Sequence, residues 1–296
     1  MTVSIPPAEL APVVSGLAFP ECPRWHESHL WFSDIADGKV LRASPDGQVS
    51  VIAQELGRPA GLGWLPGGEM LVAEGDRRRL ARLDRGEWRT HADLSTTIPF
   101  PCNDMVVDAK GRAYVGNWGF DYVARAPAAP TVLVCVLPSG DSFVAAEEML
   151  FPNGSAVTPD GRTLLVAETY AGRVSAFDVA PEGRLSNRRT WARFEHVRPD
   201  GICLDEGGAL WIASPPTRQI VRALPGGEIT HSISIDNDPL ACMLGGEDRR
   251  TLFIASSALF RERTGSWPFH TREQLREVRA GRIDSIRVEC PGAGLP

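Results

Sequence analysis

Hydrophobic and polar positions along the chain repeat in units of roughly forty residues, a period typical of propeller blades. Each unit begins with an apolar segment, such as MVVD at residues 105–108, and then turns through a short stretch rich in Gly and Asp. A second apolar strand, a third strand of alternating polarity and a weaker, more polar fourth strand follow. Four antiparallel strands joined by hairpin turns indicate a β-propeller blade.

Six such units fit into the chain, so the predicted fold is all-β: a six-bladed β-propeller with four antiparallel strands per blade. Residues 1–296 are expected to form a single domain, because no change in composition marks a linker. A strand-like stretch at residues 13–18 is expected to complete the last blade, which removes exposed sheet edges. The expected blades cover residues 23–54, 59–94, 102–149, 152–194, 199–236 and 239–289.

Two segments are longer than the repeat requires, residues 117–130 and residues 261–280. Within the second segment, the spacing from Thr271 to Val278 predicts a short helix. Insertions between inner strands lie on one face of a propeller, so both segments are candidate lids or substrate walls. Tolerated surface loops are an equally open interpretation.

A short motif occurs at the same place in every repeat, about seven to eight residues before the Gly-containing turn. Four of the six copies carry a side-chain oxygen at the matching position, namely Glu21, Asn103, Asn153 and Asp200. Equivalent positions of the repeats lie at the same height along the axis of a closed ring, so these four side chains are expected to converge near the axis. The copies are Pro20–Pro23, Pro59–Gly61, Cys102–Asp104, Pro152–Gly154, Pro199–Gly201 and Asp238–Pro239.

Glu21, Asn153 and Asp200 together form an all-oxygen set of two carboxylates and one amide carbonyl. Ca²⁺, Mg²⁺ and Mn²⁺ prefer such ligands, and Zn²⁺ accepts them. We expect one divalent cation, with Ca²⁺ favoured. Asn-Gly and Asp-Gly are also common turn dipeptides, so Asn153 and Asp200 have an alternative role as turn residues. The shared phase across distant repeats favours the metal site.

Composition, net charge and the motifs that the sequence lacks disfavour several classes of function. The chain has 296 residues, 43% of them hydrophobic, and its net charge of -6 disfavours a nucleic-acid surface. It carries no secretion signal and no apolar run of membrane-spanning length, so a cytoplasmic location is expected. The sequence contains neither a GxSxG elbow nor a nucleotide-binding glycine loop. Four cysteines lie near the starts of repeated strands and are interpreted as small buried hydrophobes rather than a thiol-rich site: Cys22, Cys102, Cys203 and Cys242.

At these motifs the chain resembles the senescence marker protein / gluconolactonase / luciferin-regenerating enzyme family. The resemblance covers nearly the whole chain, and it rests on the order of motifs that begin at Glu21, Asn103, Pro152, Pro199 and Gly245. Each motif is followed by an apolar strand, such as LWFSDI after the first and TLLVAET after the third. The order and spacing of the motifs together are more specific than any one of them.

The resemblance implies a six-bladed propeller that hydrolyses lactones with one divalent metal near its axis. It implies that Glu21, Asn153 and Asp200 bind the metal and that Asp200 also activates water. It further implies that Asn103 contacts substrate or a metal-bound water. The complete set of expected substrate contacts is Asn103, Asp104, Asn117 and Trp118.

The chain departs from sugar lactonases of this family at Pro101, where those members carry an arginine two residues before the substrate-binding asparagine. The insertion after Asn117 adds Trp118, Phe120 and Tyr122. Both departures favour a lactone or ester that is less polar than an aldonolactone. Two alternatives stay open: a non-catalytic propeller that binds a ligand or partner around a structural cation, and a phosphotriesterase-like hydrolase on the same scaffold. The sequence does not predict the oligomeric state.

Overall fold

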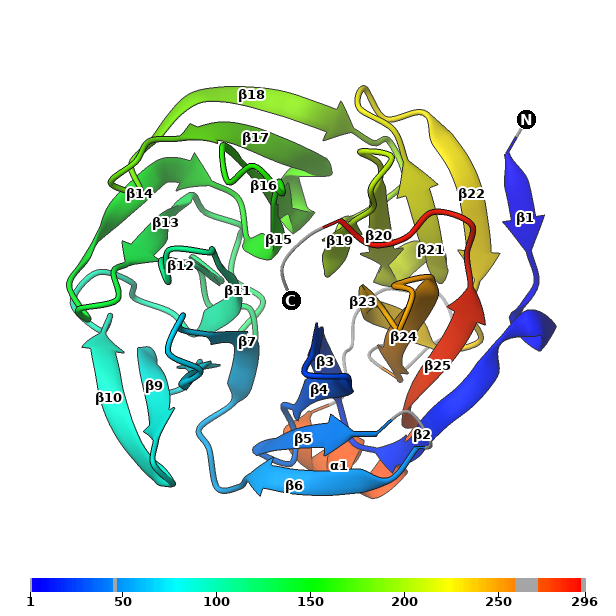
Figure 1. The fold of residues 1–296 in the computed structure, drawn as a ribbon, viewed down its shortest axis with the longest axis horizontal. Helices are drawn as coiled ribbons and strands as arrows, with labels where there is room; N and C mark the ends of the chain where they lie inside the picture. The colour runs from blue at the N-terminus through cyan, green and yellow to red at the C-terminus, as the bar shows by residue number, and fades with distance from the viewer. Residues whose placement is uncertain (1, 45–46, 259–270, 294–296) are drawn as a thin grey trace.

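The computed structural model describes residues 2–44, 47–258 and 271–293, which form a ring of six β-sheets around a central axis (Figure 1). The strand that opens each repeat lies nearest the axis, and the later strands lie towards the rim (Figure 1). This arrangement confirms the predicted six-bladed β-propeller. Within the described ranges, no helix is long and apolar enough to cross a membrane.

The first four blades each consist of four consecutive antiparallel strands. They are β3 (Pro20–His26), β4 (His29–Asp34), β5 (Lys39–Ala43) and β6 (Val49–Ala53); β7 (Pro59–Trp64), β8 (Met70–Glu74), β9 (Arg79–Asp84) and β10 (Glu87–Asp93); β11 (Cys102–Val107), β12 (Ala113–Asn117), β13 (Thr131–Val136) and β14 (Ser142–Met149); β15 (Pro152–Val157), β16 (Thr163–Glu168), β17 (Arg173–Val179) and β18 (Leu185–Arg193).

The last two blades include strands from the N-terminal segment. The fifth contains β19 (Ile202–Leu204), β20 (Leu210–Ser214), β21 (Gln219–Ala223) and β22 (Ile229–Ser234), and β1 (Val3–Ile5) pairs parallel to β22. The sixth contains β23 (Asp238–Gly245), β24 (Thr251–Ser257), β25 (Gly281–Arg287) and β2 (Ala11–Leu17), which pairs antiparallel to β25. The N-terminal segment therefore joins the rims of blades five and six. Strand β1 is not predicted from the sequence, because three residues close to prolines are too few to show an alternating pattern.

The hydrophobic core lies between neighbouring blades. One cluster joins Trp31 and Val40 of blade one to Leu62 and Val72 of blade two, and another joins blades four and five. Cys22, Cys102, Cys203 and Cys242 are buried, as the sequence predicted. Inner strands are covered on both faces and read as nearly continuous apolar runs, whereas the outer strand β18 is largely exposed.

Glycines in the repeated motif allow the inner strands of adjacent blades to approach closely. A Cβ on Gly154 would lie 2.5 Å from the backbone nitrogen of Ile202, and one on Gly61 would lie 2.4 Å from that of Met105. Asn153 lies within strand β15, and Gly154 does not have a positive φ. The interpretation of Asn153-Gly154 as a turn is therefore wrong, because the glycine serves inter-blade packing.

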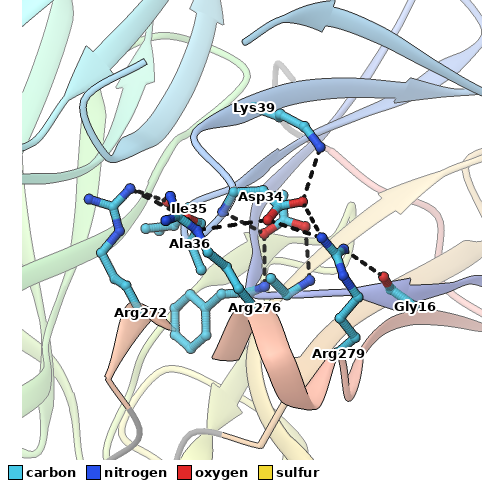
Figure 2. A network of polar contacts seen from close by, with 11 residues as sticks. Gly16, Asp34, Ile35, Ala36, Lys39, Arg272, Arg276 and Arg279 are labelled. Atoms are coloured by element: carbon cyan, nitrogen blue, oxygen red, sulfur yellow. Dashed lines mark hydrogen bonds and ion pairs between the residues drawn. The ribbon is translucent and has the colours of Figure 1, made fainter. Parts of the chain in front are cut away.

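Helix α1 (Arg272–Val278) matches the short helix predicted from the sequence. Thr271 caps it and forms a reciprocal capping box with Gln274. Three arginines of this region bind blade one (Figure 2): the Arg276 Nε atom lies 2.7 Å from the Ala36 carbonyl oxygen, and Arg279 pairs with Asp37. The other elements are the 3-10 turns Pro7–Glu9, Thr169–Ala171 and Pro215–Thr217. Residues 261–270 of the predicted insertion lie outside the described residues.

Candidate functional site

The starts of the inner strands surround a cavity of about 520 Å³ at one end of the ring axis. Every blade contributes to its wall, because the six motifs lie at the same height. The lining residues that belong to the six repeated motifs or directly follow one include Glu21, Ala60, Asn103, Asn153, Asp200 and Leu240. The equal phase seen in the sequence thus corresponds to one shared cavity.

Glu21, Asn153 and Asp200 all face this cavity. Glu21 and Asn153 are the second residues of β3 and β15, and Asp200 lies two residues before β19. The side chain of Asn153 donates a hydrogen bond from Nδ2 to Oδ1 of Asp200, and a second one of 3.2 Å to Oγ1 of Thr169. All three site residues are at least nine-tenths buried.

Each of the three side chains also has one oxygen that accepts no hydrogen bond from the described residues. These oxygens are Oε1 of Glu21, Oδ1 of Asn153 and Oδ2 of Asp200, whereas Oε2 of Glu21 accepts from the Cys22 backbone and Oδ1 of Asp200 accepts from Asn153. Three oxygens of this type can bind a hard cation and leave positions for water and substrate. The set fits a divalent ion such as Ca²⁺.

Burial perturbs both acids of the site. It raises the pKa of Glu21 to about 8, and the nearby charge of Asp104 adds to the effect. Burial also raises the pKa of Asp200 well above its ordinary value, and the second cause is the charge of Glu21. The two carboxyls therefore lie close enough to repel each other when both are ionised.

A buried ion pair lies beside these acids. Nη2 of Arg24 is 2.6 Å from Oδ1 of Asp104, both side chains are almost fully buried, and Arg24 also donates to the Met105 carbonyl oxygen. When all three are ionised, the carboxylates of Glu21, Asp104 and Asp200 exceed the single Arg24 guanidinium by two negative charges. A divalent cation would balance this charge, which supports the fit of the donor set.

The described residues contain no group of three or more His, Cys, Asp or Glu side chains arranged for a metal. The candidate set instead combines two carboxylates with the Asn153 amide. Arg24 was missed by the sequence analysis. The only available signal was a charged residue within the apolar segment that follows Glu21.

The four predicted substrate contacts divide into two groups. Asn103 and Trp118 line the cavity, and the side chain of Asn103 donates a 3.4 Å hydrogen bond to the Pro152 carbonyl oxygen. Asp104 and Asn117 lie outside the cavity lining. Asp104 pairs with Arg24, and Asn117 is fully buried.

The amide group of Asn117 bonds within its own blade. Its Nδ2 donates to the Val132 carbonyl oxygen at 2.7 Å, and its Oδ1 accepts from the Thr131 hydroxyl at 2.6 Å. Both interactions join β12 to the start of β13. These bonds hold the start of the insertion 117–130 against its own blade.

Both insertions contribute to the cavity wall. The first supplies an aromatic layer in which Trp118 and Tyr122 pack against Phe151, and the second supplies Arg272 and Leu275 of α1. The described parts of both insertions thus form walls of this cavity, as the first of the two alternatives requires. The arginines Arg58, Arg125 and Arg272 also line the cavity and were not predicted.

Comparison with known proteins agrees with this architecture. The profile of the SMP-30/Gluconolactonase/LRE-like region matches residues 19–258, so the chain belongs to this family. A 6-deoxy-6-sulfogluconolactonase from Pseudomonas putida is 28% identical over 93% of both chains. Regucalcin from Danio rerio is 27% identical over 80% of this chain and 82% of its own length. A pentonolactonase from Haloferax volcanii is 25% identical over 80% of this chain and 81% of its own length.

Solved structures share the fold. A luciferin-regenerating enzyme superposes with a TM-score of 0.81 at 18% identity, covering 97% of this chain and 98% of the other. A calcium-binding protein, regucalcin from Agrobacterium tumefaciens, superposes with a TM-score of 0.81 at 17% identity, covering 100% and 99%. At this level of identity the likeness establishes the six-bladed propeller alone.

Proposed function

We propose that this protein is a divalent-metal-dependent hydrolase that opens lactones or closely related esters. The observation that carries the proposal is the convergence on one cavity of Glu21, Asn153 and Asp200, each with one oxygen that accepts no hydrogen bond from the described residues. Membership of a family with relatives named as lactonases supports the reaction class. We propose Ca²⁺ as the ion because every ligand is an oxygen.

A bound divalent cation supplies positive charge that polarises an ester carbonyl and lowers the pKa of nearby water. Glu21 and Asn153 would hold the ion, and Asp200 would also contact it. The hydrogen bond from Asn153 to Oδ1 fixes the orientation of the Asp200 carboxylate. Asp200 lines the cavity, and it is the group proposed for proton transfer.

In the proposed reaction, Asp200 accepts a proton from water as the water oxygen bonds to the carbonyl carbon of the lactone. The ring carbon–oxygen bond then breaks, and the departing oxygen takes the proton from Asp200. The product is the open hydroxy acid. Asn103, in the cavity wall, is positioned to donate a hydrogen bond to the substrate.

A pH-indicator screen of γ- and δ-lactones tests the proposal. The protein is assayed as purified, after exhaustive chelation, and after return of Ca²⁺, Mn²⁺ or Zn²⁺. We expect ring opening that disappears on chelation and returns with one of the ions. Full turnover by metal-free protein, or no turnover of any lactone with metal present, contradicts the proposal; turnover of phosphotriesters alone supports the alternative hydrolase.

A further inference from the structure

Two guanidinium groups lie in the wall of the cavity and share one carboxylate. Nε of Arg58 is 3.1 Å from Oδ1 of Asp76, and Nη1 of Arg272 is 2.9 Å from Oδ2 of the same side chain. Two positive charges therefore face one negative charge. The Asp76 side chain is 43% exposed, so solvent and salt screen its attraction for the two guanidiniums. Arg125 and Glu273 line the cavity as well, so three guanidiniums face the carboxylates of Asp76 and Glu273, an excess of one positive charge.

The Arg58 guanidinium is held in a defined position. Its central carbon lies 4.6 Å from the centre of the Trp118 ring, and the side chain is only 20% exposed. Stacking on an aromatic face fixes the plane of the guanidinium. Burial lowers the pKa of Arg58, and although Asp76 opposes this effect, the neighbouring charge of Arg272 adds to it.

Arg272 has a donor that lacks an acceptor. Its Nη2 makes weak contacts with the carbonyl oxygens of Ile35 and Ala36, at 3.3 and 3.4 Å (Figure 2). Its Nε is buried and has no hydrogen-bond partner among the described residues. Because this Nε is enclosed by protein, a ligand would contact the terminal nitrogens of Arg272, where the long Nη2 contacts could be exchanged for a shorter bond to a charged acceptor.

The remaining wall between the acidic and basic groups is largely apolar and includes Phe19, Ile35, Tyr122, Phe151 and Leu240. The lining of this one cavity thus contains both the carboxylates of Glu21 and Asp200 and the guanidiniums of Arg58 and Arg272. Arginine presents two parallel donors that match a carboxylate.

We propose that the substrate is a lactone that carries a carboxylate, which Arg58 and Arg272 bind while the ester carbonyl faces Glu21 and Asp200. This inference rests on the proposed lactonase function and specifies its substrate class. The competing interpretation is that both arginines only attach α1 to blade two through Asp76. The two interpretations differ in whether the arginines discriminate an acid from a neutral ligand of the same shape.

Isothermal titration calorimetry with tetrahydrofuran-2-carboxylate and tetrahydrofuran-2-carboxamide tests the subsite, because neither ligand contains an ester that the protein can hydrolyse. We expect the wild-type protein to bind the acid about tenfold more tightly than the amide, the effect of one or two charge-assisted hydrogen bonds. Arg58→Gln and Arg272→Gln should each remove most of this preference, and Arg58→Lys should retain part of it.

Arg77→Gln is the matched control, because Arg77 follows Asp76 directly and carries the same charge but lies outside the cavity lining. It should keep the preference for the acid. Equal affinities of the wild-type protein for acid and amide, no measurable binding of the acid, or an unchanged preference in both glutamine variants overturns the inference. Melting temperatures of all variants show whether a lost preference reflects lost folding.

A parallel hydrolysis assay separates this inference from the proposed function. It uses a γ-lactone with a ring carboxylate and the corresponding carboxamide. Acid-selective binding without turnover of either lactone supports the subsite and contradicts the lactonase. Turnover of both lactones with equal kcat/KM supports the lactonase and overturns the carboxylate subsite.

Discussion

Asn153 donates a side-chain hydrogen bond to Asp200 although 47 residues separate them in the chain. A backbone bond accompanies it, from the Gly154 nitrogen to the Asp200 carbonyl oxygen at 3.2 Å. The two bonds connect the inner strand of blade four to the start of blade five. The geometry of the candidate metal site therefore depends on how closely these two blades pack.

Gly154→Ala should disturb the site without removing any ligand. The added methyl group would lie 2.5 Å from the Ile202 nitrogen and 2.6 Å from the Asp200 carbonyl oxygen, both of which are backbone atoms that cannot rotate away. We expect the free energy of unfolding to fall by about 1–3 kcal/mol, as in other overpacked cores. Gly57→Ala is the control for urea titration, because its nearest neighbour is the flexible Arg77 side chain at 3.3 Å.

Asp200→Asn should lower metal content and activity together. The substitution keeps the shape of the side chain but removes a charged ligand and the group that accepts a proton. We expect kcat to fall at least about 100-fold, the scale of a lost general base, and metal analysis to show substoichiometric binding. Asp160→Asn, at an exposed turn, should change neither quantity. Wild-type turnover in Asp200→Asn would exclude the proposed role.

Arg24→Met and Asp104→Asn should each destabilise the protein strongly. Each substitution leaves one buried charge without its partner, which costs about 3–5 kcal/mol. The double variant should lose less unfolding free energy than the sum of the two single variants, because neither charge of the pair then remains buried without its partner. Urea unfolding in the presence of chelator measures this coupling without a contribution from metal. Additive losses would show that the two side chains act independently.

Glu168 should contribute stability that acid removes. Burial raises its pKa, but hydrogen bonds from Arg173 and Ser175, among others, outweigh burial, so its pKa lies below the ordinary value of 4.5. A carboxyl with a lowered pKa stabilises the fold above its unfolded pKa, and the contribution disappears as pH falls through the folded value.

Glu168→Gln should therefore be less stable than wild type by about 2 kcal/mol near neutral pH, since the partner arginines are partly exposed. The difference should shrink as pH drops below about 4.5. Thermal unfolding from pH 7 to pH 3 measures this trend. A difference that stays constant across the range would show that the charge of Glu168 is not responsible.

Asn117→Ala and Trp118→Phe should change different properties although the residues are adjacent: the first should lower stability and the second should raise KM. Asn117→Ala leaves the Val132 carbonyl and the Thr131 hydroxyl without partners, so we expect a loss of about 1–3 kcal/mol in unfolding free energy with KM unchanged. Trp118→Phe weakens the stack with Arg58, so KM should rise about two- to fivefold. Steady-state kinetics and urea unfolding of both variants test this division. A raised KM in Asn117→Ala would assign it a substrate contact.

Much of the architecture could be predicted from the chain because propeller blades are local. Each strand and turn is encoded within a few residues, so the apolar runs in segments such as residues 105–108 and the Gly-containing turns indicated the sheets directly. The equal phase of Glu21, Asn153 and Asp200 could also be read, since a closed repeat places equivalent positions at equal height. The family resemblance supplied their expected roles.

The sequence by itself determined the repeat, the blade number and the oxygen donors at one height on the axis. Only the tertiary structure decided which neighbours of these donors face the cavity: Trp118 does, whereas Asp104 pairs with Arg24 instead. It also brought Arg58 and Arg272 to one carboxylate across more than two hundred positions of chain. The physical reason is that side-chain direction and long-range pairing depend on how blades and insertions pack, and no local pattern records that packing.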